Sequence, residues 1–318
     1  MRPLCLLVTL AACSATPSDP MAGGPDAGPS GEGGGPTVDA NETSAACSGL
    51  ASQPRDATWT VGGRSVKVHV PASYDPTART PIVINLHGYA SDGADQARVS
   101  KMIALSDAKG FIAVHPEGHD SPRGWNAGVC CGSAATSGTN DTQWISSVID
   151  ELETKVCVDS DRVFATGLSN GAFMAQRLAC ELSDRIAAIA PVAGVVGITT
   201  CNPTRPVPVF EVHGTSDNVV PYNGGGFNGN EPVATTINRW ATHNGCTAAP
   251  ATTFDHGDAT CVTRGGCTDG ADVTLCTIDG GGHQWPGGES IGIFNGKKSD
   301  DLDSTTAMWT FFAAHPRK

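Results

Sequence analysis

At 318 residues the chain is long enough to bury one large core, and a single α/β domain often has this size. A formal net charge of −12 argues against nucleic-acid binding, because a phosphate-binding face needs clustered lysines or arginines and the sequence has no such cluster. We interpret the acidity as an aid to solubility.

The first residues are typical of an export signal. A short apolar stretch ends at Ala12, too short to span a bilayer, and Cys13 follows it directly. This pattern resembles a bacterial lipobox, so residues 1–12 are predicted to be the signal and Cys13 the lipid-attachment residue. An ordinary signal cleaved nearby is the alternative. Residues 13–46 continue as a Gly/Pro-rich linker that cannot bury enough apolar surface to fold, which leaves 47–318 as the folded domain.

Expected strands and helices alternate along the rest of the chain. A hairpin is predicted over 57–61 and 65–70, around Gly62 and Gly63. The later strands are mostly continuous apolar runs, as expected where both faces of a sheet are covered, at 81–86, 111–114, 162–166, 186–189, 207–212 and 273–278. Helical spacing predicts helices over 95–109, 142–156, 172–182, 233–243 and 304–314. The alternation predicts an α/β fold with a mostly parallel central sheet, helices on both faces and an N-terminal antiparallel hairpin.

Twelve cysteines indicate disulfide bonds in an oxidising compartment. Ten remain once Cys5 leaves with the signal and Cys13 is assigned to lipid. Zinc is the alternative, but no paired C-x-x-C spacing occurs, so no metal site is expected. Four cysteines stay unassigned: Cys47, Cys130, Cys131 and Cys157. The expected pairs are Cys180 with Cys201, Cys246 with Cys267, and Cys261 with Cys276, the last joining two arms of a predicted hairpin.

Residues 167–171 have the G-x-S-x-G pattern with Ser169 at its centre. The pattern follows an expected strand and precedes an expected helix, which is the context that exposes a nucleophilic serine on a sharp turn. Gly167 and Gly171 allow that turn without a Cβ clash. A Gly-Ser turn without catalysis is the alternative. Ser169 is therefore the predicted nucleophile.

A serine hydroxyl needs a base to remove its proton, and the base needs an acid to orient it. His283 lies just past the last expected strand and is the predicted base. Asp217 lies just past strand 207–212 and is the predicted acid. Asp141 is the alternative acid, but it precedes the serine and is better explained as a helix cap. His213 is assigned a structural role.

The oxyanion of an acyl-transfer intermediate needs two preplaced N–H donors. We expect the backbone N–H groups of Asn170, which follows the nucleophile, and Tyr89, which follows the strand ending at Leu86. Three side chains are predicted to contact substrate, with core packing of the tryptophans as the alternative: Trp285, Trp125 and His87.

Six motifs occur in order between residues 57 and 316. They are Leu86-His87-Gly88, Gly124-Trp125-Asn126, Cys130-Cys131-Gly132, the Gly-Leu-Ser-Asn-Gly-Ala turn, His213-Gly214-Thr215-Ser216-Asp217 with Val220-Pro221-Tyr222, and Gly281-Gly282-His283-Gln284-Trp285-Pro286-Gly287. Together they resemble the esterase family of secreted polyhydroxybutyrate depolymerases and feruloyl esterases. The resemblance implies an α/β-hydrolase fold and ester hydrolysis through an acyl-serine, with Ser169, Asp217 and His283 as nucleophile, acid and base. Tyr89 departs from the cysteine that polymer depolymerases often carry there.

The sequence thus predicts a secreted serine esterase acting on feruloyl, acetyl or short hydroxyacyl esters, such as a plant polysaccharide ester or a hydroxyalkanoate oligomer. A non-catalytic surface protein that binds carbohydrate or a partner on the same scaffold is the alternative, and a broken triad would be its sign. No cofactor is expected. We expect an exported monomer, either extracellular or held at the bacterial cell envelope by its lipid anchor alone.

Overall fold

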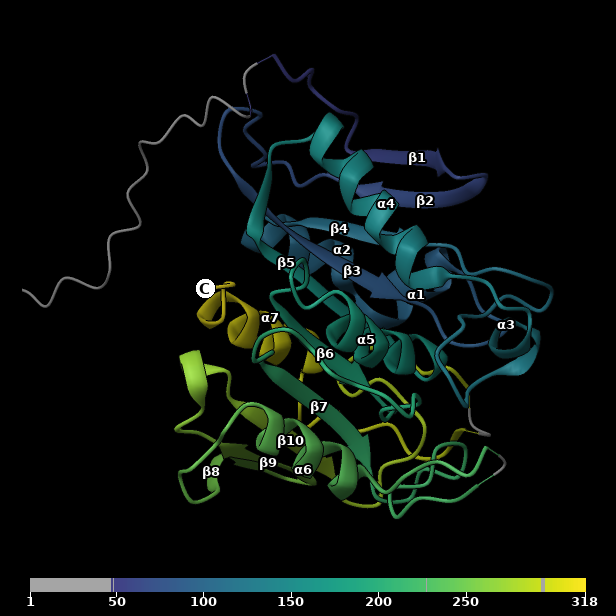
Figure 1. Ribbon diagram of the computed structural model, residues 1–318, viewed down its shortest axis with the longest axis vertical. Helices are drawn as coiled ribbons and strands as arrows, with labels where there is room; N and C mark the ends of the chain where they lie inside the picture. Colours follow the sequence, from purple (N-terminus) through teal and green to yellow (C-terminus); the bar gives the residue numbers. More distant parts are fainter. Residues whose placement is uncertain (1–46, 48, 227, 293–294) are drawn as a thin grey trace, which may run out of the picture. The chain divides into compact units, whose positions relative to one another are not determined.

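Among the described residues, ten strands form one sheet (Figure 1). Their bounds are β1 (Asp56–Val61), β2 (Arg64–His69), β3 (Thr80–Leu86), β4 (Ile112–Pro116), β5 (Val158–Leu168), β6 (Ala188–Val192), β7 (Val209–Gly214), β8 (Ala251–His256), β9 (Ala259–Arg264) and β10 (Val273–Ile278). The spatial order is β1-β2-β4-β3-β5-β6-β7-β10-β9-β8. The six central strands, β4-β3-β5-β6-β7-β10, are each parallel to the next, and antiparallel pairs complete both edges.

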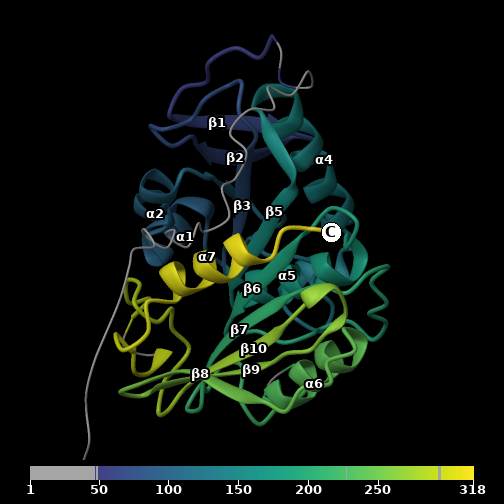
Figure 2. The same cartoon turned by 90° about the vertical axis from the view of Figure 1, so that its left-hand side faces the viewer.

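Helices cover both faces of this sheet (Figure 2). They are α1 (Gly93–Ser100), α2 (Met102–Lys109), α3 (Gly132–Thr136), α4 (Asp141–Lys155), α5 (Asn170–Glu181), α6 (Val233–His243) and α7 (Ser304–Ala314). One buried cluster joins the sheet to α4, α5 and α6, and a second joins it to α1, α2 and α7. Strands β3, β4, β6 and β7 are buried along their whole length, as their continuous apolar runs predict. The predicted fold class is confirmed.

The computed structural model describes residues 47, 49–226, 228–292 and 295–318. The predicted signal, the lipid-attachment residue Cys13 and nearly all of the predicted linker lie outside the described residues. All described residues belong to one compact unit. None of the helices in these ranges is long and apolar enough to cross a membrane.

The single helix predicted over 95–109 is two helices, which differs from the sequence expectation. Lys101 joins them in the left-handed backbone region, with φ of 55°. The hydroxyl of Ser100 donates to the Gln96 carbonyl oxygen and accepts from the Met102 N–H group. The Ser100 side chain thereby forms hydrogen bonds with backbone groups at the break. Serine often competes in this way with the backbone hydrogen bonds of a helix.

Five disulfides link the described cysteines, and three of them are the pairs expected from the sequence. Those three are Cys180–Cys201, Cys246–Cys267 and Cys261–Cys276. Cys261 and Cys276 are directly opposite on the antiparallel strands β9 and β10. The four unassigned cysteines form Cys47–Cys157 and Cys130–Cys131. This number of bridges fits an oxidising, extracytoplasmic environment.

Candidate active site

Ser169 occupies the turn between β5 and α5. Its backbone has φ of 57° and ψ of −122°, a conformation that non-glycine residues rarely adopt. The Ser169 N–H group donates to the Val192 carbonyl oxygen at the end of β6, and the Ser169 carbonyl oxygen accepts from Phe173 in the first turn of α5. These bonds hold the strained residue in place, and its side chain faces a pocket at the carboxyl end of the parallel strands.

The two glycines of the G-x-S-x-G pattern are needed because the turn packs against β3. A Cβ atom on Gly171 would lie 2.1 Å from the carbonyl oxygen of Leu86. A Cβ atom on Gly167 would lie 2.6 Å from the same oxygen. No larger residue fits either position without moving backbone, so both glycines are fixed by the close approach of the turn to its neighbouring strand.

The predicted base and acid are hydrogen-bonded to each other. His283 follows β10 and lines the pocket together with Ser169. Its Nδ1 atom lies 2.7 Å from Oδ2 of Asp217, which follows β7. The other carboxylate oxygen of Asp217 accepts the N–H groups of Val219 and Val220, both at 2.8 Å. This arrangement leaves Nε2 of His283 as the ring atom available to a substrate or to a serine hydroxyl.

Burial and hydrogen bonding act in opposite directions on the pKa of Asp217. Burial by itself would raise the pKa. The hydrogen bond and charge of His283, the nearby His213 and the Val220 N–H group outweigh burial, so the pKa lies below its usual value. Asp217 is therefore ionised at neutral pH and can stabilise an imidazolium at His283.

A buried polar chain continues behind Asp217. The Nε2 atom of His213 lies 3.5 Å from Oδ2 of Asp217 and 2.8 Å from the Val220 carbonyl oxygen. Its Nδ1 atom lies 3.3 Å from Oε1 of Glu211. Gln176 in α5 donates to the other oxygen of Glu211 at 3.0 Å. His213 thus has a structural role, as the sequence predicted, and the structure adds that it contacts the candidate acid.

This chain of groups shifts two more pKa values. Full burial is the main cause that raises the pKa of Glu211 to about 7. Burial would lower the pKa of His213, but its hydrogen bond and charge interaction with Glu211 and the charge of Asp217 raise it overall. Both groups therefore keep their protons to a higher pH than they would in water.

The two predicted oxyanion donors lie beside Ser169. Asn170 is the first residue of α5, where a backbone N–H group has no acceptor within its own helix. Gly88 and Tyr89 line the same pocket as Ser169. A Cβ atom on Gly88 would lie 3.6 Å from Cβ of Ser169, so this backbone segment directly adjoins Ser169.

The pocket has a volume of about 570 Å³ and a mixed lining. Its apolar and aromatic side chains are Tyr89, Val99, Leu168, Val219 and Ile291. Its polar side chains besides Ser169 and His283 are Ser91, Asp95, Gln96, Asn228 and Asn295. The ring of Tyr89 lies against Gly132, where a Cβ atom would be 2.4 Å from Cε2 of Tyr89. Such a lining can hold an apolar acyl group and hydrogen-bond to hydroxyl groups around it.

The three predicted substrate-contacting side chains lie in the interior instead. Trp125 is fully buried, and its Nε1 atom donates to the His87 carbonyl oxygen at 2.9 Å. The His87 ring accepts the Gly118 N–H group and is also fully buried. Trp285 is buried and donates to Thr305. None of the three lines the described pocket. Their placement matches the core-packing alternative for the tryptophans and does not agree with substrate contact.

Asp141, the alternative acid, belongs to a different cluster. Its carboxylate pairs with Arg64 at 2.6 Å and accepts the Asn126 N–H group at 2.6 Å. The residue that caps α4 is Asn140, whose side chain accepts from Gln143. Asp141 therefore ties the Gly-Trp-Asn segment to β2 rather than orienting the base.

Sequence reasoning missed the contribution of α1 to the pocket. Asp95, Gln96 and Val99 lie on this helix and line the pocket. Their spacing at positions i, i+1 and i+4 places them on one side of a helix, but nothing in the sequence indicates that this side meets Ser169. Val219 gave a clearer signal, because it is an apolar residue only two positions after Asp217. The structure leaves its side chain exposed.

Comparison with known proteins gives one family and several relatives. A family model described as Esterase PHB depolymerase matches residues 66–221. Feruloyl esterase B of Piromyces equi is 36% identical over 237 residues, which are 69% of this chain and 42% of that protein. Putative esterase NocK of Nocardia uniformis subsp. tsuyamanensis is 32% identical over 229 residues, 65% of this chain and 66% of that protein. Probable feruloyl esterase C of Aspergillus terreus is 28% identical over 277 residues, 83% of this chain and 90% of that protein. The chain thus spans less than half the length of the Piromyces relative.

Solved structures show the same fold at low sequence identity. The acetyl xylan esterase from Aspergillus awamori superimposes with a TM-score of 0.57 and 17% identity, covering 81% of this chain and 99% of that chain. A thermostable esterase superimposes with a TM-score of 0.51 and 16% identity, covering 82% of this chain and 63% of that chain. Within the described ranges, no group of three or more His, Cys, Asp or Glu side chains is arranged to hold a metal ion.

Proposed function

We propose that this chain, which belongs to the esterase family of polyhydroxybutyrate depolymerases and feruloyl esterases, hydrolyses carboxylic esters through an acyl-serine intermediate on Ser169. One observation carries the proposal. Ser169 occupies a strained turn at the wall of a pocket that it lines together with His283, and His283 is bonded at 2.7 Å to the ionised Asp217.

The reaction has two halves. Nε2 of His283 takes the proton as the Ser169 oxygen attacks the ester carbonyl carbon, and the resulting oxyanion accepts hydrogen bonds from the N–H groups of Asn170 and Tyr89. Collapse breaks the ester bond, and the departing alkoxide receives the proton from His283. In the second half a water molecule attacks the acyl-serine with the same base, which releases the carboxylic acid and restores Ser169. Asp217 holds the imidazole and stabilises its charged form in both halves.

The buried pair behind the acid extends this machinery. Full burial prevents the ring of His213 from turning toward solvent, and its Nε2 atom lies 3.5 Å from Oδ2 of Asp217, the oxygen that also faces His283. When both of its ring nitrogens are protonated, His213 presents a positive charge to the Asp217 carboxylate. His213 and Glu211 are therefore positioning residues for the acid.

Replacement of Ser169 by alanine tests the proposal. Hydrolysis of p-nitrophenyl acetate is expected to fall by about a millionfold, the loss seen when a serine hydrolase loses its nucleophile. Ser147→Ala on α4 is the matched control and should keep full activity. Circular dichroism should give the same spectrum for both variants. Unchanged turnover in the Ser169 variant would reject the mechanism, and a wild-type domain that reacts with no ester would favour the non-catalytic binding role instead.

The substrate class we propose is an ester of an aromatic, acetyl or short hydroxyacyl acid. The mixed lining of the pocket supports it, because Tyr89 and Ile291 offer apolar surface while Gln96, Asn228 and Asn295 offer amide groups. Parallel assays with methyl ferulate, acetylated xylan and 3-hydroxybutyrate oligomers would rank the three acids. A kcat/KM at the detection limit for all three would exclude this class.

We further propose that the protein is an exported monomer held at the cell envelope through Cys13. The apolar stretch before this residue and the disulfides of the domain support export. In a bacterial host, Cys13→Ser should move the protein from the membrane fraction to the soluble exported fraction. A wild-type protein that is already soluble would instead favour ordinary signal cleavage.

A further inference from the structure

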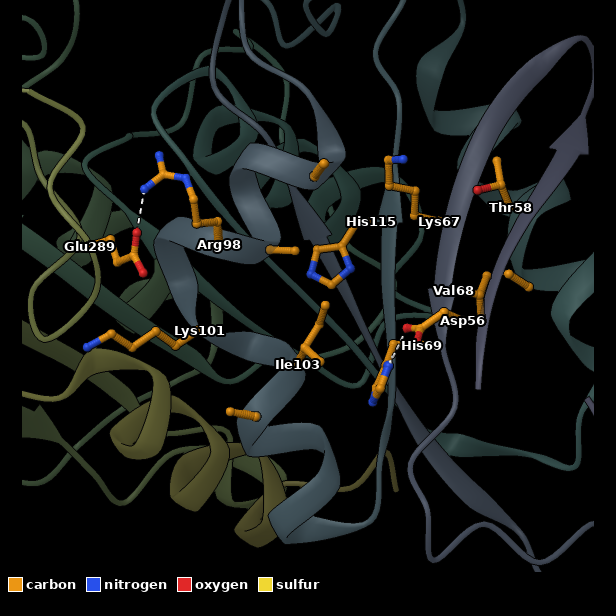
Figure 3. Close-up of a pocket in the computed structure, with 14 residues that line it drawn as sticks. Asp56, Thr58, Lys67, Val68, His69, Arg98, Lys101, Ile103, His115 and Glu289 are labelled. Atoms are coloured by element: carbon orange, nitrogen blue, oxygen red, sulfur yellow. Dashed lines mark hydrogen bonds and ion pairs between the residues drawn. The ribbon is translucent and has the colours of Figure 1, made fainter. Parts of the chain in front are cut away.

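A second cavity of about 600 Å³ lies outside the candidate active site. It is formed by the β1–β2–β4 edge of the sheet on one side and by α1 and α2 on the other (Figure 3). Ala97, Ile103 and Ala104 supply apolar surface from the helices. Polar side chains from β1, β2 and β4 occupy the opposite wall.

His115 on β4 is the unusual group in this cavity. Its side chain points into the space between the sheet edge and the two helices (Figure 3), and the residue is only 1% exposed. Its Nε2 atom has no hydrogen-bond partner among the described residues. Burial is the main cause that lowers the pKa of His115 to about 3, so the ring is neutral at neutral pH. A buried polar atom without a partner is rare in native proteins and calls for a partner.

Lys67 lies directly opposite His115. The two residues are paired across the antiparallel strands β2 and β4, so their side chains share one face of the sheet. Of the other charged groups around the cavity, Arg98 pairs with Glu289 at 2.6 Å and His69 pairs with Asp56 at 2.7 Å.

Two cations of the lining form no ion pair with a described residue, while the charge of Lys67 acts on nearby Glu117. Lys101 donates to the Gly287 carbonyl oxygen, and within the described residues Lys67 makes no ion pair. Three Lys or Arg residues and two carboxylates line this cavity, whereas the chain as a whole has 20 cations and 32 acids. The cavity is therefore locally cationic on an acidic protein.

We propose that this cavity binds a small monocarboxylate with an apolar body, held by Lys67 and His115. The carboxylate would accept one hydrogen bond from the ammonium group of Lys67 and one from an N–H group of His115. Its apolar body would contact Ala97 and cover Ile103 and Ala104, which are exposed in the structure. The ligand satisfies the orphaned imidazole nitrogen and the unpaired cation together.

Helix α1 places this ligand next to the candidate active site. Asp95, Gln96 and Val99 of α1 line the catalytic pocket, while Ala97 and Arg98 of the same helix line the second cavity. The same helix therefore lines both spaces. A ligand packed against α1 would restrain the wall of the catalytic pocket and change KM. This coupling, unlike binding itself, rests on the proposed esterase function, whose product is also a carboxylic acid.

Calorimetry on the full-length Ser169→Ala protein tests binding without turnover. 4-Phenylbutyrate is the probe, and 4-phenyl-1-butanol is its uncharged counterpart. Lys67→Met should weaken binding of the acid by about tenfold or more and leave the alcohol unchanged, because only the charged hydrogen bond is lost. Lys109→Met, an exposed lysine on α2 outside the cavity, is the matched control. Equal affinity of the acid for the Lys67 and Lys109 variants would overturn the proposal, as would absence of binding.

Filling the cavity gives an independent test of location. Ala104→Trp projects an indole into the cavity from an exposed position on α2, and Ala108→Trp, one turn further along, does not line it. Binding of 4-phenylbutyrate should be lost only in the Ala104 variant. Equal binding in both variants would place the acid elsewhere, including the catalytic pocket. In wild-type protein, a change in KM with added 4-phenylbutyrate that disappears in the Ala104 variant tests the coupling, and an inactive wild-type would leave the calorimetric result intact.

Discussion

Replacing Glu211 by glutamine should change how stability depends on pH. Glu211 is fully buried beneath the candidate acid, accepts a hydrogen bond from Gln176, and faces His213 at 3.3 Å. Glutamine has nearly the same shape. Its oxygen can accept from Gln176 and its amide group can donate to Nδ1 of His213, so the neutral hydrogen bonds survive the change.

The magnitude follows from the pKa of Glu211. Burial raises it from an ordinary value of 4.5 to about 7. The difference between these two pKa values corresponds to about 3 to 4 kcal/mol, at about 1.4 kcal/mol per pH unit. Because the folded pKa is the higher one, this stability is fully present below pH 4.5 and is lost as the pH rises through 7. The pKa of His213 is raised as well, so its contribution has the same sign and does not offset this loss.

Denaturant unfolding at pH 5, 6, 7 and 8 measures this effect. The free energy of unfolding of Glu211→Gln minus that of wild type should rise by up to about 3 kcal/mol from pH 5 to pH 8, because the variant has no carboxyl group to ionise. Glu153→Gln, at an exposed position of α4, supplies the baseline for loss of one carboxylate. A Glu211 difference as flat as this baseline would refute the assignment of a raised pKa to Glu211.

Four further predictions concern the site and its support. Asp217→Asn should lower kcat by about 10⁴ with the fold retained. The amide oxygen would bind the loop N–H groups, so the NH₂ group would face His283 and could not accept the Nδ1 proton. Steady-state kinetics would check this, and a loss below tenfold would contradict it. Gly88→Ala should keep the wild-type Tm, since its Cβ atom would be 3.5 Å from the Leu168 carbonyl oxygen, yet slow turnover by up to about a hundredfold by crowding Ser169. Gly171→Ala should instead lower the unfolding free energy by more than about 3 kcal/mol, because its Cβ atom would be 2.1 Å from a backbone oxygen; equal Tm values for these two glycine variants would contradict the packing of the turn. Removing Cys157 together with its partner should cost about 4 to 5 kcal/mol of unfolding free energy, since their bridge closes a separation of 110 residues, and a cost below about 1 kcal/mol would show that the bridge does not restrain the unfolded chain.

The sequence predicted those parts of the fold that local pattern determines. Strands β3 and β7 were recognisable because every residue in them is buried and most of these residues are apolar. The turn at Ser169 was recognisable because its glycines are required by a close backbone approach. Strand β8 was not predicted, since its residues are exposed throughout and only pairing with β9 makes them a strand.

The walls of the pocket could not be predicted, because they depend on contacts between distant segments. Its motif suggested that Trp125 lines the pocket. In the structure, the Asn170 side chain accepts the Trp125 N–H group and donates to the Trp125 carbonyl oxygen. The indole N–H group of Trp125 donates to the His87 carbonyl oxygen inside the core. The break at Lys101 depends on how the Ser100 hydroxyl is buried. The spacing of apolar residues along the sequence indicates neither the contacts of Trp125 nor those of the Ser100 hydroxyl.

The central claim is that Ser169 is a nucleophile activated by His283. Mass spectrometry of tryptic peptides after brief exposure to a fluorophosphonate ester measures this directly. We predict one phosphonylated residue, Ser169, in the wild-type protein, and strongly slowed labelling in a His283→Ala variant that retains the wild-type circular dichroism spectrum. Labelling of a different residue, or equal labelling rates in the two proteins, would contradict the claim.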